Sequence, residues 1–251
     1  MEIAFLGNAC AVPHIRSGFT SVLFRNNAVS VLVDAVDNPV RDLMTIGQDP
    51  CMLQVLVLTH THVDHLGGFP SLIATLSNME RLMPLTVLAT PDVQEHALHI
   101  LYAYGIDPKS LPYQLVFEYQ GYSDSGMAVQ LLTGHHSVPT QMVRIVAHES
   151  SILYTSDIEY EASFYTGVPE CSVLIHEATY FHADLVPGGG HSSALQAGEA
   201  ARALNAKRLF LCHLCSRAMD QSNLLAEEAR QVFGGEIIVP DPHVWYEGRA
   251  V

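Results

Sequence analysis

The stretch Thr59-His60-Thr61-His62-Val63-Asp64-His65 decides how this chain folds and what it can bind. It follows the unbroken apolar run 55–58, which is typical of a buried strand, so its polar residues lie on the turn that leaves that strand. In an extended segment His60 and His62 point to the same side and can reach one ion. The start of the next helix brings Asp64 and His65 round to a second ion. The pattern therefore predicts a metal site.

The residue types indicate which metals this site would take. Neutral imidazole and carboxylate are ligands of Zn²⁺ and of other borderline divalent ions, and paired ions in two-metal hydrolases lie roughly 3.5 to 4 Å apart. The alternative is a polar turn with hydrogen-bonded histidines, but burying these groups without a metal would be costly. We expect two divalent ions, Zn²⁺ first, with Mn²⁺ or Fe²⁺ as alternatives because the same ligands accept them.

Further ligand types stand at the ends of other predicted strands. The pair His135-His136 ends the strand expected at 128–133, Asp157 follows the apolar residues 152–154, and His213 follows 209–212. Each of these residues could also serve in a turn or as a helix cap. Together with the first motif, they are better explained as the remaining ligands.

Length, composition and charge restrict the class of protein. A chain of 251 residues, 49% of them hydrophobic, can bury a sizeable core, and we expect one hydrolase domain over 1–251. Acidic residues number 26 against 12 basic ones, for a net charge of −14. This charge disfavours strong non-specific binding to nucleic acid and favours a small or locally recognised substrate.

The termini and the cysteines bear on the compartment. The chain opens without a basic segment, and no apolar stretch approaches the roughly 18 residues of a membrane span, so we expect a soluble cytoplasmic protein with no membrane contact. Five scattered cysteines fit a reducing compartment. Cys212 and Cys215 form a C-x-x-C motif, which could be a redox pair or a thiolate site, but the apolar residues before it favour core packing.

Many strands alternate with few helices along the chain, without a linker, repeat or low-complexity segment. This order predicts an α/β fold in which two mixed β-sheets are covered by helices, with an opening β-meander. The expected helices are 68–78, 92–104, 192–204 and 221–232. The expected strands are 2–6, 20–24, 29–33, 55–58, 86–89, 114–118, 128–133, 142–147, 152–155, 172–176, 208–212, 236–239 and 243–246.

Taken in order, the predicted ligands resemble those of the metallo-β-lactamase superfamily, from Glu2 to about His213. Within the superfamily, the details look most like ribonuclease Z and related phosphodiesterases. The matching segments are Phe5-Leu6-Gly7 with Val12-Pro13, His136-Ser137-Val138-Pro139, His176-Glu177-Ala178-Thr179 and His191-Ser192-Ser193-Ala194. The last two are specific and the first is weak. The resemblance implies a four-layer αββα sandwich.

The resemblance also implies the role of each ligand. His60, His62 and His136 would hold the first metal, Asp64, His65 and His213 would hold the second, and Asp157 would bridge both. His136 is preferred to His135 because the subgroup's ligand stands two residues before the valine-proline pair. A hydroxide that bridges the metals would be the nucleophile. Asp64 and His191 are thus the expected catalytic residues.

His191 is the most informative residue outside the predicted metal ligands. It follows a run of three glycines and precedes Ser193 and Gln196, which predict a capping box. In the resembled family this histidine contacts the scissile phosphate and protonates the leaving oxygen. A surface histidine in a glycine-rich loop is the alternative. Asp34, His176 and Glu177 are expected to orient ligand imidazoles from outside the metal shell, although each could equally form a structural salt link or a helix cap.

One departure from ribonuclease Z affects the expected substrate. Only 20 residues separate His136 from Asp157, where tRNA-processing enzymes carry a long basic arm, and residues 102–124 hold a single lysine, Lys109. We therefore expect a dinuclear phosphodiesterase that acts on a small phosphodiester or an RNA end, and the resemblance implies a homodimer. The alternatives are an acyl hydrolase of a lactone, thioester or carboxylic ester, and a non-catalytic binding protein. His191 favours phosphodiester chemistry over acyl chemistry, and the complete ligand set argues against a non-catalytic protein.

Overall fold

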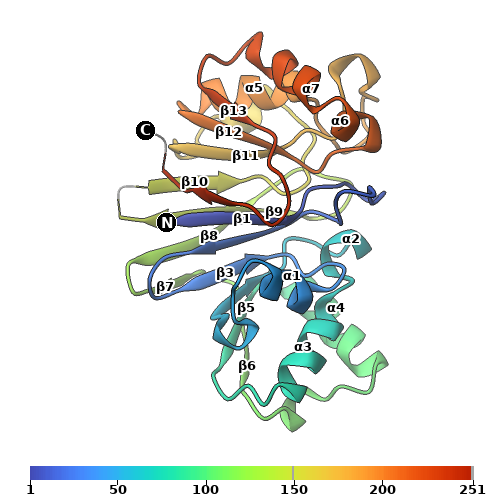
Figure 1. Ribbon diagram of the computed structural model, residues 1–251, viewed down its shortest axis with the longest axis vertical. Helices are drawn as coiled ribbons and strands as arrows, with labels where there is room; N and C mark the ends of the chain where they lie inside the picture. Colours follow the sequence, from blue (N-terminus) through green and yellow to red (C-terminus); the bar gives the residue numbers. More distant parts are fainter. Residues whose placement is uncertain (149, 250–251) are drawn as a thin grey trace.

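The computed structural model describes residues 1–148 and 150–249. Two seven-stranded mixed β-sheets pack face to face, and helices cover both outer faces (Figure 1), which is the predicted αββα sandwich. The strand order is β14-β1-β2-β3-β4-β5-β6 in the first sheet and β13-β12-β11-β10-β9-β8-β7 in the second.

The first sheet is antiparallel at one side and parallel at the other. β1, β2 and β3 form the predicted meander, and β3 to β6 run parallel. The last strand of the chain, β14, pairs with β1 and forms one edge of this sheet. Its strands are β1 (Glu2–Gly7), β2 (Ser21–Arg25), β3 (Ser30–Val33), β4 (Val55–Val57), β5 (Leu85–Leu88), β6 (Leu115–Glu118) and β14 (Trp245–Glu247).

The second sheet has the same mixed character. β7 to β10 are antiparallel neighbours, and β10 to β13 run parallel. β9 and β10 form the simple hairpin predicted between His136 and Asp157. Its strands are β7 (Tyr122–Asp124), β8 (Met127–Thr133), β9 (Gln141–Ala147), β10 (Ser150–Tyr154), β11 (Val173–Glu177), β12 (Arg208–Cys212) and β13 (Glu236–Ile238).

Strand alternation divides the core into three layers. Ile3 and Phe5 of β1 face the space between the sheets, whereas Ala4 and Leu6 face the helices of the first half. α1, α3 and α4 cover the first sheet, and α5, α6 and α7 cover the second (Figure 1). The helices are α1 (Pro39–Thr45), α2 (Val63–Leu66), α3 (Phe69–Asn78), α4 (Pro91–Ala103), α5 (Ala194–Ala203), α6 (Ser216–Asp220) and α7 (Ser222–Arg230). Four short 3-10 turns are η1 (Pro50–Met52), η2 (Pro108–Ser110), η3 (Ala162–Tyr165) and η4 (His182–Asp184).

The elements missed by the sequence prediction are short. Helices α1 and α6 and strand β7 were not predicted, and none of them exceeds seven residues. The four-residue helix α2 was expected only as a helix start at Asp64 and His65. α1 did carry a start signal, because the Asn38 side chain accepts a hydrogen bond from the Arg41 amide and Pro39 is the first helical residue. The four predicted helices are all present.

The parallel strands of both sheets end at the same edge of the sandwich. Asp34 follows β3, residue 59 comes soon after β4, Asp157 follows β10, Glu177 ends β11 and His213 follows β12. Polar residues from distant parts of the chain therefore meet at one place.

Within the described residues, every helix is too short or too polar to cross a bilayer. The five cysteines are free thiols there, and Cys212 of the C-x-x-C motif is buried between the sheets.

Candidate metal centre

Four side chains form a first donor group at this edge. His62 Nδ1 lies 3.2 Å from both His60 Nε2 and His136 Nε2. Asp157 Oδ2 lies 3.9 Å from His60 Nε2 and 3.8 Å from His136 Nε2. A tetrahedral zinc site with ordinary bond lengths has donor atoms about 3.3 Å apart, so these separations suit one ion.

A second donor group shares Asp157 with the first. His65 Nε2 lies 3.2 Å from Asp157 Oδ1 and 3.7 Å from Asp64 Oδ2. His213 Nε2 lies 3.3 Å from Asp157 Oδ2 and 3.5 Å from Asp64 Oδ2. The donor atoms within each group lie within 4.8 Å of one another. The structure therefore brings together all seven side chains that the sequence analysis named as ligands, in the two expected sets.

Two buried atoms of the second group have no hydrogen-bond partner among the described residues. These are His65 Nε2 and Asp157 Oδ1, and they face each other across the group. An unsatisfied buried polar atom is costly in a folded protein. A cation between these atoms would satisfy both.

The charge of the site also fits divalent ions. Asp34, Asp64, Asp157 and Glu177 are buried here, with at most 4% of each residue exposed. Among the described residues, no lysine or arginine forms an ion pair with any of the four. Buried carboxylates need compensating positive charge. Two divalent ions would supply four positive charges at this position.

The protonation states of His60, His136 and Asp157 suit metal binding. Burial, and then the charge of His65, lowers the pKa of His60, and burial lowers the pKa of His136, so both rings are neutral at neutral pH. Burial alone would raise the pKa of Asp157, but the imidazoles of His213 and His65 hold it well below its usual range. Neutral imidazole and ionised carboxylate are the forms that bind metals.

Asp34 and Thr59 orient two imidazoles from the first sheet. Asp34 Oδ2 lies 2.7 Å from His65 Nδ1, and the Thr59 hydroxyl donates to the same carboxylate oxygen at 2.9 Å. Since that hydroxyl proton is used, its oxygen is free to accept from His60 Nδ1 at 3.0 Å. Both rings are thus held with Nε2 facing the donor groups, as ligand-orienting partners do in metal sites.

Glu177 and Thr179 repeat this arrangement on the second sheet. Glu177 Oε1 lies 2.9 Å from His191 Nδ1, and Glu177 Oε2 accepts from the Thr179 hydroxyl at 2.7 Å. The Thr179 oxygen then accepts from His213 Nδ1 at 3.0 Å. The carboxylate also accepts from the amides of Ile158 and Thr179, so it is well solvated by protein donors.

The expectation for His176 is wrong. Its ring nitrogens lie 2.6 Å from the Tyr165 hydroxyl and 2.6 Å from the Glu177 carbonyl, and it contacts none of the seven candidate ligands among the described residues. The reason is strand alternation in β11, which turns Glu177 towards the donor groups and His176 towards the helix side of the sheet. His176 therefore packs beneath the site and does not orient a ligand.

Comparison with known proteins agrees with this geometry. Residues 19–213 match the family model of the metallo-beta-lactamase superfamily. The chain belongs to this superfamily. Ribonuclease Z of Natronomonas pharaonis is 25% identical, over 96% of this chain and 96% of the relative. Ribonuclease Z of Methanothermobacter thermautotrophicus is 26% identical, over 93% and 92%.

Solved structures of low sequence identity share the fold. The metallo-beta-lactamase fold protein YhfI from Bacillus subtilis superposes with a TM-score of 0.83 at 21% identity, covering 98% of both chains. Human tRNase Z, short form, superposes with a TM-score of 0.81 at 19% identity, covering 100% of both chains. A diphosphatase of the PhnP family reaches 0.72 at 16% identity, covering 98% of this chain and 97% of that one. These likenesses establish the sandwich.

A pocket of about 330 Å³ opens onto the two donor groups of this superfamily member. Its walls come from the loop after β1, the start of α2, the loop after β8 and the glycine loop 188–190. Among the described residues, no lysine or arginine lines it. The lining residues are Ala11, His62, Val63, Asp64, His136, Ser137, Asp157, Gly189 and His191.

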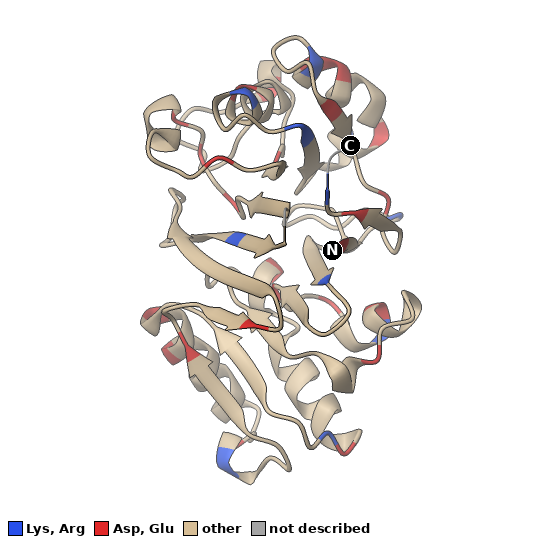
Figure 2. Cartoon of the chain, turned by 90° about the vertical axis from the view of Figure 1, so that its left-hand side faces the viewer, with Lys and Arg blue, Asp and Glu red and all other residues tan. Residues whose placement is uncertain are grey.

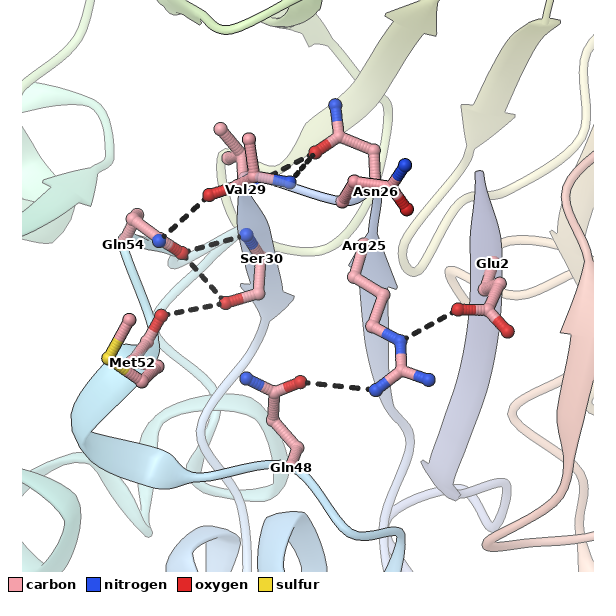
Figure 3. A pocket seen from close by; sticks show the side chains of 10 residues that line it. Glu2, Arg25, Asn26, Val29, Ser30, Gln48, Met52 and Gln54 are labelled. Atoms are coloured by element: carbon pink, nitrogen blue, oxygen red, sulfur yellow. Dashed lines mark hydrogen bonds and ion pairs between the residues drawn. The ribbon is translucent and has the colours of Figure 1, made fainter.

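A second hollow, of about 360 Å³, lies at the opposite end of the first sheet, around the β2–β3 turn (Figure 3). Its polar groups are engaged with one another. Arg25 pairs with Glu2 at 2.9 Å, and the side-chain oxygen of Gln54, Oε1, accepts from the Ser30 amide and hydroxyl. None of its described lining residues has a buried side-chain polar atom without a hydrogen-bond partner, so the pocket over the donor groups is the functional candidate.

Sequence reasoning missed the residues that support the site. Thr59 and Thr179 stand beside or near named residues, but only packing shows that each hydroxyl links a carboxylate to an imidazole. Gly190 and Glu159 were not singled out either, although the Gly190 carbonyl accepts from His136 Nδ1 at 2.6 Å. The glycine run itself is the sequence signal that could have pointed to this loop, because Gly188 and Gly190 adopt φ values of +73° and +77°.

Proposed function

We propose that this protein is a metal-dependent hydrolase that cleaves phosphodiester bonds with two divalent ions, Zn²⁺ first. The observation that supports it is the pair of donor groups that share Asp157, placed beside the His191–Glu177 pair in one pocket. His60, His62 and His136 would hold one ion, Asp64, His65 and His213 the other, and Asp157 both. When bound, the ions would supply an activated water molecule at neutral pH and positive charge opposite the phosphate.

His191 has the position of a proton donor to the leaving oxygen. Its Nδ1 is engaged by Glu177, so its Nε2 is the atom available towards the pocket that the ring lines. Burial disfavours the charged ring, but the hydrogen bond and charge of Glu177 outweigh this effect and raise the pKa of His191 to about 9. The ring is therefore protonated at neutral pH, as a general acid requires. Its stacking on His213, with ring centroids 5.2 Å apart, keeps it next to the second group.

The proposed substrate is a small phosphodiester or the end of an RNA. A protein that grips a nucleic-acid backbone uses clustered lysines and arginines. Figure 2 shows the face with both termini, where basic residues are scattered singly among acidic ones. The space between His136 and Asp157 holds only the β9–β10 hairpin. The alignment with the Natronomonas ribonuclease Z spans 295 positions, more than the 251 residues of this chain, so that relative carries segments this chain lacks.

Metal analysis followed by a substrate panel tests the proposal. The purified protein should hold two equivalents of a transition metal and hydrolyse bis(p-nitrophenyl) phosphate and cyclic nucleotides faster than phosphomonoesters, lactones or β-lactams. A preference for lactones or thioesters would replace the phosphodiesterase proposal with an acyl hydrolase. Efficient maturation of a tRNA precursor would contradict the proposal that the substrate is small. A homodimer stays a prediction, which light scattering would check.

A further inference from the structure

The loop that carries His191 is held by a carboxylate that belongs to no donor group. Glu159 is half-buried, two residues after Asp157, and its side chain accepts two backbone hydrogen bonds from the glycine loop 188–190. The Gly188 amide donates to Oε1 at 2.7 Å, and the Gly190 amide donates to Oε2 at 3.3 Å. One carboxylate thus binds two amides of a loop whose glycines would otherwise allow many backbone conformations.

The same loop touches the first donor group directly. The carbonyl of Gly190 accepts from His136 Nδ1 at 2.6 Å, which sets the tautomer in which His136 Nε2 faces His62 and Asp157. A side chain at Gly190 would approach His136 Nδ1 to 3.0 Å, and φ is +77° there, so this contact requires glycine. The position of the Gly190 carbonyl therefore determines how a candidate ligand is oriented.

The segment around Glu159 joins the loops that line the pocket. The Glu159 amide donates to the His135 carbonyl at 2.8 Å. The Ile158 carbonyl accepts from the Ser192 hydroxyl at 2.6 Å, and the Ile158 amide donates to Glu177 at 3.0 Å. The backbone of this segment therefore contacts the loop that carries His136, and it also contacts Ser192, which follows His191, and Glu177, which pairs with His191. The contacts of the Glu159 side chain can be removed by a single substitution that changes neither Ser192 nor Glu177.

We propose that Glu159 is a positioning residue: its carboxylate holds the glycine loop so that Gly190 orients His136 towards the first ion and His191 stays beside the second group. The proposal rests on the proposed metal site. Outer partners of metal-binding histidines are worth about 10- to 100-fold in metal affinity or activity. Glu159 acts at one remove, through Gly190, and the effect should concern the first ion more than the second.

Glu159→Gln and Glu159→Ala test this proposal, with Glu161→Gln as the matched control. The amide of glutamine has one acceptor oxygen and places an N–H donor against a second N–H, so one of the two loop contacts is lost. Glu161 lies in the same segment, is exposed and contacts Ser163. It receives the same change of charge without contact to the glycine loop.

The first measurement is metal affinity, by competition with a chromogenic zinc chelator. Both Glu159 variants should bind one of the two Zn²⁺ equivalents at least about 10-fold more weakly, whereas Glu161→Gln should match the wild type. The second measurement is turnover of bis(p-nitrophenyl) phosphate, where kcat should fall and KM should rise because Gly189 lines the pocket. Wild-type affinity for both ions in Glu159→Gln and Glu159→Ala would overturn the proposal.

Two further outcomes are separable. If the wild type hydrolyses no phosphodiester but the Glu159 variants still lose affinity for one ion, the proposed function fails and the positioning role stands. If the variants do not fold, hydrogen exchange of the wild-type protein with Zn²⁺ decides instead. The Gly188 and Gly190 amides should be protected from exchange. Exchange at the rate of an unstructured loop would overturn the proposal that Glu159 holds them.

Discussion

At the scale of single residues, His191 separates proton donation from metal binding. His191→Ala should keep two metal equivalents, because His191 belongs to neither of the two groups that share Asp157. We expect about a 100-fold loss of kcat/KM on a phosphodiester with an alcohol leaving group, and a smaller but clear loss on bis(p-nitrophenyl) phosphate, whose leaving group needs less protonation. Steady-state kinetics with metal analysis check this.

His99→Ala, on the exposed face of α4, is the control for removing a histidine. It should leave both metal content and turnover unchanged. Turnover of His191→Ala equal to that of this control would refute the role of His191.

Asp157 tests whether one carboxylate serves both donor groups. Its carboxylate lies between the groups, since Oδ1 lies 3.2 Å from His65 and Oδ2 lies 3.3 Å from His213, both of the second group, and Oδ2 also lies 3.8 Å from His136 of the first. Asp157→Ala should therefore lower the metal content at both positions together, as measured by inductively coupled plasma spectrometry. Loss of a single equivalent would show that Asp157 does not bridge.

At the scale of elements, Arg81 joins the segments that precede β4 and β5. Its guanidinium is buried and donates to the carbonyls of Leu53 at 2.5 Å, Cys51 at 2.6 Å and Pro84 at 2.7 Å, without a carboxylate partner among the described residues. β4 leads into the metal motif, so Arg81 supports the strand that carries it. This arginine has a structural role, and burial lowers its pKa.

Arg81→Lys should destabilise the fold by about 3 kcal/mol, because a lysine cannot reach several carbonyls in fixed directions. Chemical unfolding measures this, with Arg41→Lys as the control, since the Arg41 side chain is 70% exposed and pairs only with its neighbour Asp42. Metal content at low temperature should stay unchanged in both. A change of stability no larger than that of the control would contradict the structural role.

At the scale of the whole molecule, the proposed ions join the two halves of the sandwich. His60 and His65 come from the first sheet, and Asp157 and His213 come from the second. Removing the ions with a chelator would leave the buried carboxylates without compensating charge. Ions at about 1,000 times their dissociation constant stabilise a fold by about 4 kcal/mol.

Thermal unfolding with and without chelator should therefore differ by roughly 10 °C, given about 2 to 4 °C per kcal/mol for a chain of this size. Adding Zn²⁺ back should restore the higher Tm. An unchanged Tm after verified metal removal would show that the sheets do not depend on the ions for their association.

Local patterns were enough to predict much of the fold and the residues that meet in the site. The apolar run before His60 predicted a buried strand, and alternation predicted the meander of β1 to β3, because facing and period are properties of neighbouring residues. Strand-end positions identified the pair His135-His136, Asp157 and His213 as residues that would come together, and the family resemblance selected His136 from the pair. Elements of only a few residues, such as β7, escaped because so short a segment carries no measurable period.

The sequence by itself determined the donor types, their order and the layers of the sandwich. Only the tertiary structure decided which groups support them: Glu177 faces His191 whereas its neighbour His176 faces Tyr165, and Glu159 holds the loop that meets His136. The physical reason is the separation along the chain of the residues that interact. A period along the chain is set by adjacent backbone geometry, whereas the 2.6 Å contact between His136 and Gly190 joins residues 54 positions apart and exists only once both loops are packed at the same sheet edge.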